Sequence, residues 1–328
     1  MKHEYPYIDK MRIVAAILVI CIHISPLAQI NLTADFVLTR IIARIAVPFF
    51  FITTAYFLFQ DGYPQLYKIK KTLFQLIKWY FIAIIIYLPV MFYNHYFNDG
   101  QLALKIIQDL LIDGTFYHLW YFPAMMTGII IVLLLKKCFN TKTAFMITII
   151  LYMIGLSGDS YYGLMINIPL MKNVLQCLFH FMDYTRNGFF FAPLFIMIGV
   201  IIGENKTKLT FQANILMFLI CFLIMGLEAY VLHYFDFCKH DSMYVLLPFV
   251  SYFFFRILIS FQGQRSQYFK NLSLYMYVLH PLMIIVVRMI GKISNVELLI
   301  NGNFVQFICV TILTLCISIG IEGVVNNG

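Results

Sequence analysis

The chain has 328 residues, of which 62% are hydrophobic and only 12% are charged. Soluble globular domains have about a quarter of their residues charged, so this composition excludes a soluble protein and indicates an integral membrane protein. The net charge of +8 does not indicate nucleic-acid binding, because lysines in cytoplasmic loops explain it under the positive-inside rule. The seven cysteines include no C-x-x-C pair, so we expect no metal site and no disulfide framework.

Ten apolar stretches approach the length of about twenty residues that a transmembrane helix needs. They are residues 11–30, 36–59, 73–93, 118–135, 144–156, 187–203, 211–233, 242–261, 272–290 and 304–322. Residues 101–117 instead place apolar and polar side chains on opposite sides of a helix, which predicts an amphipathic helix at the membrane interface. The fold class is therefore an all-α polytopic membrane protein, with residues 1–328 as one transmembrane domain and no soluble domain.

The basic residues of the loops predict the orientation. With a cytoplasmic amino terminus, twelve of them fall in inside loops: Lys2, Lys10, Lys68, Lys70, Lys71, Lys136, Lys137, Lys142, Lys206, Lys208, Arg265 and Lys270. Four fall in outside loops: Lys105, Lys172, Lys239 and Lys292. Because cytoplasmic loops are enriched in lysine and arginine, we expect a protein of the cell membrane with both termini in the cytoplasm.

Arg12 and His23 enclose the apolar stretch "RIVAAILVICIH" of the first span. Eleven residues of α-helix make three turns plus about 20°, so both side chains share one face, about 16 Å apart along the axis. Asp9 shares this face. The span limits place Arg12 at the cytoplasmic mouth and His23 about halfway across the membrane. Ionisable groups at such depth are functional candidates. The alternative for His23 is a neutral ring bonded to a neighbouring helix.

Further ionisable side chains occur in or near the other spans. Arg40 and Arg44 are four residues apart, which predicts one face of the second span and suits them to bind an anion such as a carboxylate or an oxyanion. The alternative is a pairing with the intramembrane Glu228 or with an outer aspartate. Arg186 lies near the outer end of a span, where its side chain can reach the headgroups.

Two histidines have competing interpretations. His118 stands beside Trp120 and Tyr121 at the outer start of the fourth span, where an interfacial aromatic belt is one interpretation and a site role the other. His280 precedes Pro281 within the ninth span. We interpret this pair first as a helix kink and second as part of a site.

Four ordered motifs carry a resemblance to a known family. "YIDKMRIVAAILVICIH" resembles the first helix of the membrane acyltransferase-3 family, with its Arg and, after ten residues, its His. "RIAVPFFFITTAYFLF", "HLWYFPAM" and "LSLYMYVLHPLMI" continue the resemblance. "YTRNGFFFAPLFIMIGVIIGE" and Glu228 resemble the membrane half of the membrane-bound serine racemases of vancomycin-resistance clusters. Those proteins add a cytoplasmic pyridoxal-phosphate racemase domain. We expect neither that domain nor pyridoxal phosphate in this chain, and leave open that a racemase domain follows in a longer parent protein.

The resemblance implies transfer of an acyl group, usually acetyl, from cytoplasmic acyl-CoA to an extracytoplasmic acceptor. The acceptor is a small molecule or a cell-wall component such as peptidoglycan, and a homodimer is left open. The matched His23 would act as catalytic base or acyl relay, together with Arg12. The CoA phosphates would bind Arg12, Lys68, Lys70 and Lys71, although positive-inside lysines explain that loop equally well. The acceptor or an anion would bind Arg40, Arg44, His118, Arg186 and Glu228.

The chain departs from the family at two places. Thr54-Ala55-Tyr56 stands where the family has Ser-Gly-aromatic, and Lys70-Lys71 stands without the arginine that the family tends to use. A second function therefore stays open, namely transport or delivery of L-serine in D-serine-type vancomycin resistance, because buried arginines and a glutamate also suit an amino-acid carboxylate and ammonium. A membrane anchor is the third, although an anchor has no use for polar residues aligned on one face.

Overall fold

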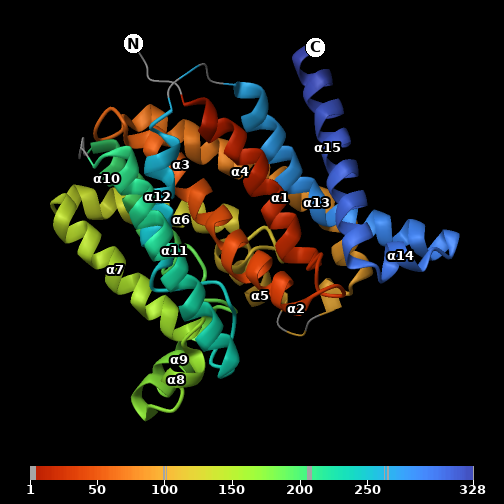
Figure 1. Ribbon diagram of the computed structural model, residues 1–328, viewed down its shortest axis with the longest axis horizontal. Coiled ribbons are helices and arrows are strands. Elements are labelled where there is room, and N and C mark those ends of the chain that lie inside the picture. The colour runs from red at the N-terminus through yellow and green to blue at the C-terminus, as the bar shows by residue number, and fades with distance from the viewer. Residues whose placement is uncertain are drawn as a thin grey trace. The chain divides into compact units, whose positions relative to one another are not determined.

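The computed structural model describes residues 5–98, 100, 102–204, 209–261, 263 and 266–327. Within these ranges the chain consists of helices and connecting turns, and no strand occurs (Figure 1). The elements are α1 (Pro6–Ile24), α2 (Leu32–Phe36), the π-helical turn η1 (Val37–Ile41), the 3₁₀ turn η2 (Ile42–Ile45), α3 (Ala46–Phe59), α4 (Leu66–Tyr93), the 3₁₀ turn η3 (Tyr96–Asn98), α5 (Leu102–Gln108), the π-helical turn η4 (Asp109–Asp113), α6 (Tyr121–Cys138), α7 (Thr141–Gly158), α8 (Tyr162–Met165), α9 (Pro169–Phe181), α10 (Ala192–Glu204), α11 (Phe211–Tyr234), α12 (Leu247–Leu258), α13 (Gln267–Ser294), α14 (Glu297–Ile300) and α15 (Asn303–Asn327).

Seven helical segments of the described chain are long and apolar enough to cross a membrane. They are Leu32–Phe59, α4, α6, α7, α11, α13 and Asn303–Val325 of α15. The helices α10 and α12 are shorter and apolar, and α1 has 19 residues with Asp9, Lys10 and Arg12 near its start. Each of the ten expected spans overlaps one of these segments, so the all-α polytopic fold class is confirmed.

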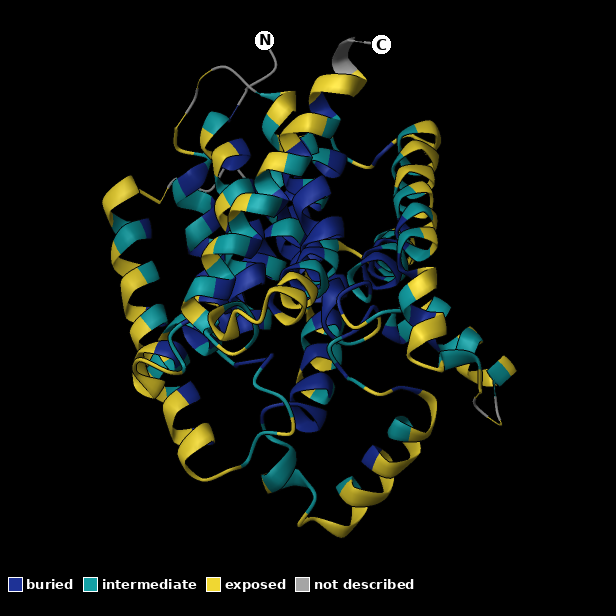
Figure 2. Cartoon of the chain, turned by 90° about the vertical axis from the view of Figure 1, so that its right-hand side faces the viewer, coloured by how far each residue is buried: buried dark blue, intermediate teal, exposed yellow. Residues whose placement is uncertain are grey.

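The spanning helices differ in how much of their surface is covered by protein. In the most apolar window of α4, α11 and α15, only 22% of the residues are buried, compared with 61% for α13 and 72% for Leu32–Phe59. Figure 2 shows exposed positions in bands along several helices, with buried positions opposite. Because α4, α11 and α15 are apolar even where exposed, their uncovered faces are suited to lipid.

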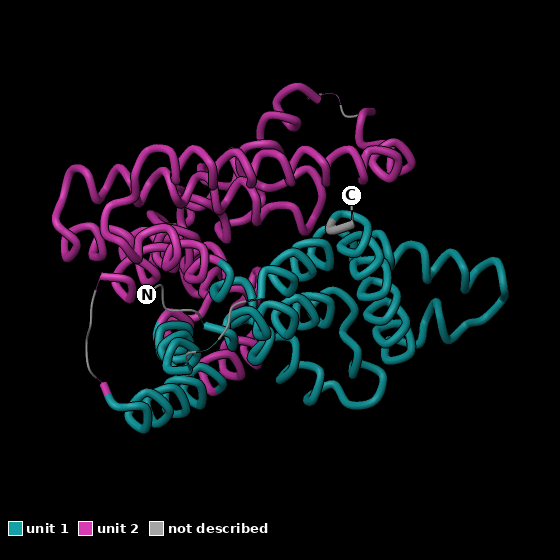
Figure 3. Tube along the Cα trace, turned by 90° about the horizontal axis from the view of Figure 1, so that it is seen from above, with its two compact units in different colours: residues 1–50, 210–226, 249–328 teal, residues 51–209, 227–248 magenta. Residues whose placement is uncertain are grey.

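The chain divides into two compact units, each built from separate stretches of sequence (Figure 3). Unit 1 consists of Met1–Phe50, Thr210–Gly226 and Phe249–Gly328. Unit 2 consists of Phe51–Leu209 and Leu227–Pro248.

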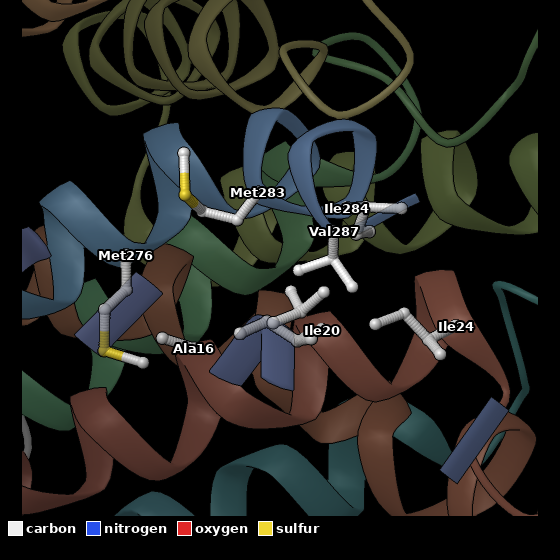
Figure 4. Close-up of a cluster of buried hydrophobic side chains, with 8 residues drawn as sticks. Ala16, Ile20, Ile24, Met276, Met283, Ile284 and Val287 are labelled. Atoms are coloured by element: carbon white, nitrogen blue, oxygen red, sulfur yellow. The ribbon is translucent and has the colours of Figure 1, made fainter. Parts of the chain in front are cut away.

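Unit 1 is built around α13, which contacts both α1 and α15. The Nδ2 of Asn271 donates to Glu322 Oε1 at 3.0 Å, and Arg288 Nη2 donates to Gln306 Oε1 at 3.3 Å. The start of α13 thus meets the end of α15, so these two helices run antiparallel. A cluster of buried apolar side chains joins the three helices: Ala16, Ile20, Ile24, Met276, Met283, Ile284, Val287 and Val310. Figure 4 shows the members on α1 and α13 gathered between these two helices.

Unit 2 has α10 at its centre, in contact with both α6 and α7. Every residue of α10 from Ala192 to Val200 is buried. Small residues permit this packing, because a Cβ on Gly128 of α6 would stand 2.8 Å from the Cβ of Ala192. A Cβ on Gly199 would stand 2.6 Å from the carbonyl oxygen of Ile52 in α3. Glycine at both positions lets neighbouring helices approach closely.

The first helix ends earlier than expected. The span was expected to reach residue 30, but α1 ends at Ile24, followed by Ser25 with a φ of 54°. A residue in the left-handed region ends a helix, and Pro26 cannot continue one. His23 accordingly lies in the last turn of α1, and its position about halfway across the membrane stays a prediction.

Three other expected segments also differ. The amphipathic helix expected over 101–117 ends at Asp113, because Gly114 has a φ of 84°. Lys68, Lys70 and Lys71 lie in the first two turns of α4 and not in a loop. The amphipathic helix α9 was not expected, because its residues lie in a stretch that the loop charges predict to be an outside loop. Of the basic residues used to predict the orientation, Lys2, Lys206, Lys208 and Arg265 lie outside the described residues.

Replacing Gly199 tests the close approach of α10 to α3. We expect Gly199→Ala to lower the free energy of unfolding by about 1–3 kcal/mol, because the added Cβ overlaps the Ile52 carbonyl oxygen and lies 2.8 Å from the Cβ of Ala55. Thermal unfolding of the detergent-solubilised protein measures the change. Gly320→Ala is the matched control, because no atom lies within 4 Å of its Cβ position, and it should be neutral or stabilising by up to about 1 kcal/mol. Equal melting temperatures for Gly199→Ala and the parent would contradict the packing.

Two native cysteines test the predicted orientation. Cys177 on α9 and Cys138 at the end of α6 are both exposed, and the loop charges place Cys177 outside and Cys138 inside the cell. We expect a membrane-impermeant maleimide to label a variant retaining only Cys177 on intact cells. A variant retaining only Cys138 should react only after permeabilisation. The opposite pattern would reverse the predicted orientation.

Candidate active site

At the start of α1, Arg12 and Asp9 form a buried ion pair. The Nε of Arg12 lies 3.4 Å from Oδ1 of Asp9. The other carboxylate oxygen, Oδ2, accepts a hydrogen bond from the backbone N–H of Ser266 at 2.9 Å. Arg12 is 9% and Asp9 1% exposed. Because Ser266 is the N-cap residue of α13, this group joins the starts of α1 and α13.

In the last turn of α1, His23 stacks on His280 of α13. The ring centroids are 5.3 Å apart and the ring planes differ by 27°. His280 is fully buried, whereas His23 is half-buried. The Nδ1 of His280 lies 2.8 Å from the carbonyl oxygen of Tyr277 and 3.2 Å from that of Met276. Carbonyl oxygens only accept hydrogen bonds, so we assign the ring proton of His280 to Nδ1.

Pro281 explains the contact that His280 makes with its own helix. In an uninterrupted α-helix, the N–H of residue 281 would donate to the carbonyl of Tyr277, four residues earlier. Proline has no N–H, so this carbonyl needs another donor. The imidazole of His280 supplies it. The His280-Pro281 pair therefore fixes a ring orientation, and the same ring contacts His23.

The two contacts between α1 and α13 align the helices. Asp9 and His23 are fourteen residues apart, and so are Ser266 and His280. The helices therefore run parallel and in register. In a chain whose spans alternate in direction, the first and the ninth span cross the membrane the same way, so the parallel contact agrees with the expected order of spans. Arg12 and His23 meet different partners at opposite ends of this contact.

Arg40 and Arg44 lie in an irregular part of the helix that begins at Leu32. Arg40 belongs to the π-helical η1 and Arg44 to the 3₁₀ turn η2, and both turns contact α1. The α-helical spacing from which we expected a shared face does not hold here, because a π turn is wider and a 3₁₀ turn tighter than an α turn. Arg44 is buried with 7% exposure, whereas Arg40 is half-exposed. The irregular helix thus gives the two guanidinium groups different environments.

In unit 2, His118 is buried in the turn before α6. It is 2% exposed, and its ring meets Tyr87 of α4 edge to face at a centroid distance of 4.9 Å. The turn requires Gly114, because a Cβ there would clash with the backbone nitrogen of Trp120. An interfacial belt keeps its polar tips near the headgroups, so the burial of His118 favours the interpretation as a site residue or as part of the core.

Arg186 lies between aromatic rings of unit 2. The centre of its guanidinium is 4.6 Å from the ring of Tyr184 and 5.5 Å from the ring of Trp120. Its Nη1 donates to Ser242 Oγ at 3.4 Å. Rings on this cation hold it in a fixed position and partly replace its hydration. Trp120 follows His118 by two residues, so one short segment presents both the histidine and the ring that covers Arg186.

Glu228 on α11 is held by donors of unit 2. Its Oε1 accepts from the hydroxyl of Tyr161 at 2.9 Å and from the N–H of Val245 at 2.6 Å, and Oε2 accepts from the N–H of Leu246 at 3.2 Å. Burial, and then the charge of Glu228, raise the pKa of Tyr161, so its hydroxyl stays protonated and donates. The carboxylate thereby anchors the segment that leads into α12. Its binding of an acceptor stays a prediction.

The lysines expected to bind CoA lie on the surface of α4. Lys68 pairs with Asp61 at 2.9 Å, an exposed ion pair of the kind that contributes little to stability. Lys70 and Lys71 are exposed. Their charges can therefore bind a phosphate from solution. Lysines that only follow the positive-inside rule would be equally exposed.

Three carboxylates of unit 2 lie close enough to hold a cation. One oxygen from each of Asp109, Asp113 and Asp183 lies within 4.8 Å of the others. Burial, followed by the charge of Asp183, raises the pKa of Asp113 to about 6. The Nε2 of Gln108 donates to Asp113 at 2.8 Å, and Lys105 provides a compensating charge for Asp109. The expectation that the chain binds no metal stays a prediction at this cluster.

Two residues of unit 1 make buried contacts that the sequence interpretation did not predict. His280 was interpreted first as part of a helix kink. The sequence signal that could have identified it as a site residue was the His-Pro pair within an apolar span. Glu322, 1% exposed on α15, accepts from Asn271 of α13. A glutamate inside the last apolar stretch was the signal for a buried polar contact.

Comparisons with known proteins agree with the motifs. The acyltransferase-domain family acyltransferase-3 matches residues 5–323. Two proteins of Enterococcus faecalis named amino-acid racemase are 39% and 35% identical, over 83% and 95% of this chain and 38% and 45% of their own lengths. A serine/alanine racemase of Enterococcus gallinarum is 35% identical over 94% of this chain and 44% of its own length. No solved structure matches the chain.

The chain thus spans less than half the length of these curated relatives. The matches to them cover 83–95% of this chain, and the family match runs from the first turn of α1 almost to the end of α15. The Arg12 and His23 pattern, the segment around His118 and the His280-Pro281 pair all fall within the matched residues. The chain belongs to the acyltransferase-3 family of membrane acyltransferase domains.

Proposed function

We propose that this chain is an integral membrane O-acyltransferase that moves an acyl group, usually acetyl, from cytoplasmic acyl-CoA to an extracytoplasmic or membrane acceptor. Membership of the acyltransferase-3 family supports acyl transfer in general. The observation that carries the proposal is the stacked pair of His23 and His280. A ring pair held beside an apolar cluster provides a fixed proton acceptor away from bulk water.

In this proposal His23 takes the proton from the acceptor hydroxyl while its oxygen attacks the carbonyl carbon of the acyl thioester. The carbon–sulfur bond breaks, and the proton passes from His23 to the departing thiolate, giving the ester and free CoA. No oxidant or metal is needed for this balance. Histidine suits the step because its ordinary pKa near 6.5 lets it take and return a proton at physiological pH.

The ends of the reaction are assigned to separate groups of residues. Arg12 at the start of α1 is proposed to hold a CoA phosphate on the cytoplasmic side. Arg44 is proposed to serve the acceptor, because it is a buried cation in the expected outer half of its span. A cell-wall hydroxyl is the acceptor that this orientation would favour.

The relatives support a second candidate function. They are named racemases of amino acids, serine or alanine, and each extends well beyond the part that this chain matches. A membrane domain joined to such an enzyme has an evident use in delivering L-serine to it. In that case the buried arginines of unit 1 would bind the amino-acid carboxylate.

His23 is the residue whose loss tests acyl transfer most directly. We expect His23→Ala to lower release of the CoA thiol from acetyl-CoA by about 10²–10⁴-fold in membrane vesicles, because it removes the proton acceptor. His233→Ala is the matched control, since His233 is exposed near the end of α11 and has no proposed role. If the folded fraction of His23→Ala releases thiol at the parent rate, His23 is structural.

CoA binding tests the role of Arg12 apart from catalysis. Removing Arg12 alone would leave the buried Asp9 carboxylate uncompensated, so the informative variant is Asp9→Asn/Arg12→Gln, with Asp9→Asn as its control. We expect the double variant to bind CoA about ten- to 150-fold more weakly than the control, because one charge-assisted hydrogen bond is lost. Isothermal titration calorimetry measures both.

Arg44→Ala supplies the counterpart on the acceptor side. It should bind CoA like the parent and impair transfer. A parent protein that binds no CoA, but is stabilised against heat by L-serine, would replace acyl transfer with serine delivery.

A further inference from the structure

We propose that His280 is a positioning residue that holds the imidazole of His23 in the orientation needed for proton transfer. This inference rests on the proposed acyl transfer and adds to it a residue that acts through His23. The observations that carry it are the ring stack between the two histidines and the hydrogen bond that Pro281 makes available to His280.

His280 is restrained along its edge by a hydrogen bond and at one ring face by the stack on His23. Its Nδ1 donates to the carbonyl of Tyr277 on its own helix, so the ring cannot rotate without leaving that buried acceptor unsatisfied. Met276 and Ile284 lie one turn before and one turn after it on the same row of α13, and both are buried. His280 is therefore part of the rigid surface of α13.

The same apolar cluster extends the restraint to α1. Ile20 and Ile24 flank His23 in sequence, and both belong to the cluster shared with α13 (Figure 4). The main chain beside His23 is thus packed, while its ring is half-exposed. A histidine ring turns easily about its last side-chain torsion. The stack on His280 covers one ring face and restricts the plane in which both ring nitrogens lie.

Fixed directions matter for the proposed chemistry. A base must lie within hydrogen-bond reach of the proton that it abstracts, and displacements near 1 Å can lower a rate about a hundredfold. A ring that turns freely would spend most of its time misdirected. The proline therefore acts indirectly. It leaves the Tyr277 carbonyl available to bind His280, and His280 in turn orients His23.

Two double variants test whether a stacked ring is needed at position 280, or whether any residue that continues the helix suffices. In Pro281→Ala the restored backbone N–H can donate to the Tyr277 carbonyl, so His280 is no longer needed as its donor. On this background, His280→Phe keeps a flat ring against His23 and His280→Ala removes it. Both variants satisfy the carbonyl, so their stabilities can be matched by thermal unfolding before activity is compared.

We expect His280→Phe/Pro281→Ala to release CoA thiol from acetyl-CoA in membrane vesicles at a kcat within about threefold of the parent. His280→Ala/Pro281→Ala should lower kcat by about ten- to a hundredfold with little change in KM for acetyl-CoA, because it disturbs the base and not the binding of the donor. In ¹⁵N-histidine spectra, the ring signals of His23 should move in the alanine variant and stay near their parent positions in the phenylalanine variant.

The outcomes distinguish this inference from the proposed function. If the parent releases thiol and the alanine double variant retains the parent kcat, His280 is only a helix residue and the inference is overturned while acyl transfer stands. Equal losses in both double variants would also overturn it, since a ring would then not suffice. If the parent releases no thiol, acyl transfer fails and the positioning role fails with it.

Discussion

The contact between α1 and α13 is the interaction on which the candidate site of unit 1 depends. It joins residues 257 positions apart in the sequence at Asp9 and Ser266, and one helical stretch further along it brings His23 onto His280. An ion pair, an imidazole stack and an apolar cluster hold the same two helices. Polar groups inside a membrane domain are tolerated only with partners, so these polar contacts fix the register in which α1 packs on α13.

Local periodicity accounts for what the sequence could predict about this site. Arg12, His23 and Asp9 share a helix face because all three lie on one uninterrupted α-helix, and the spacing alone is enough to show it. The early end of α1 could also be predicted, since Ser25-Pro26 follows only one residue after His23. The sequence did not predict the partner of His23. Nothing near residue 23 specifies a ring from residue 280, and only the packing of α1 on α13 selects it.

The expectation for Arg40 and Arg44 assumed a regular α-helix, and the backbone between them is irregular. Arg40 and Arg44 would lie one above the other on an α-helix, but a π turn followed by a 3₁₀ turn separates their environments. No glycine or proline between them signals the change. The role of Glu228 could not be predicted either, because a glutamate within a membrane span can serve function or structure. The backbone N–H groups of Val245 and Leu246 that it accepts from belong to an irregular segment, and their position depends on tertiary packing.

Catalysis and transport make different demands on the histidine pair, and this difference is why acyl transfer leads the two proposals. A transporter must open its site alternately to each side, which requires neighbouring helices to separate or slide. The ring of His280 is tied to its own helix, so separating α1 from α13 would break the imidazole stack, the apolar cluster and the hydrogen bond between Asp9 and Ser266 together. A pair held at so many points is suited to a reaction whose geometry must not change. Serine delivery in such a protein would have to use a path that leaves α1 on α13.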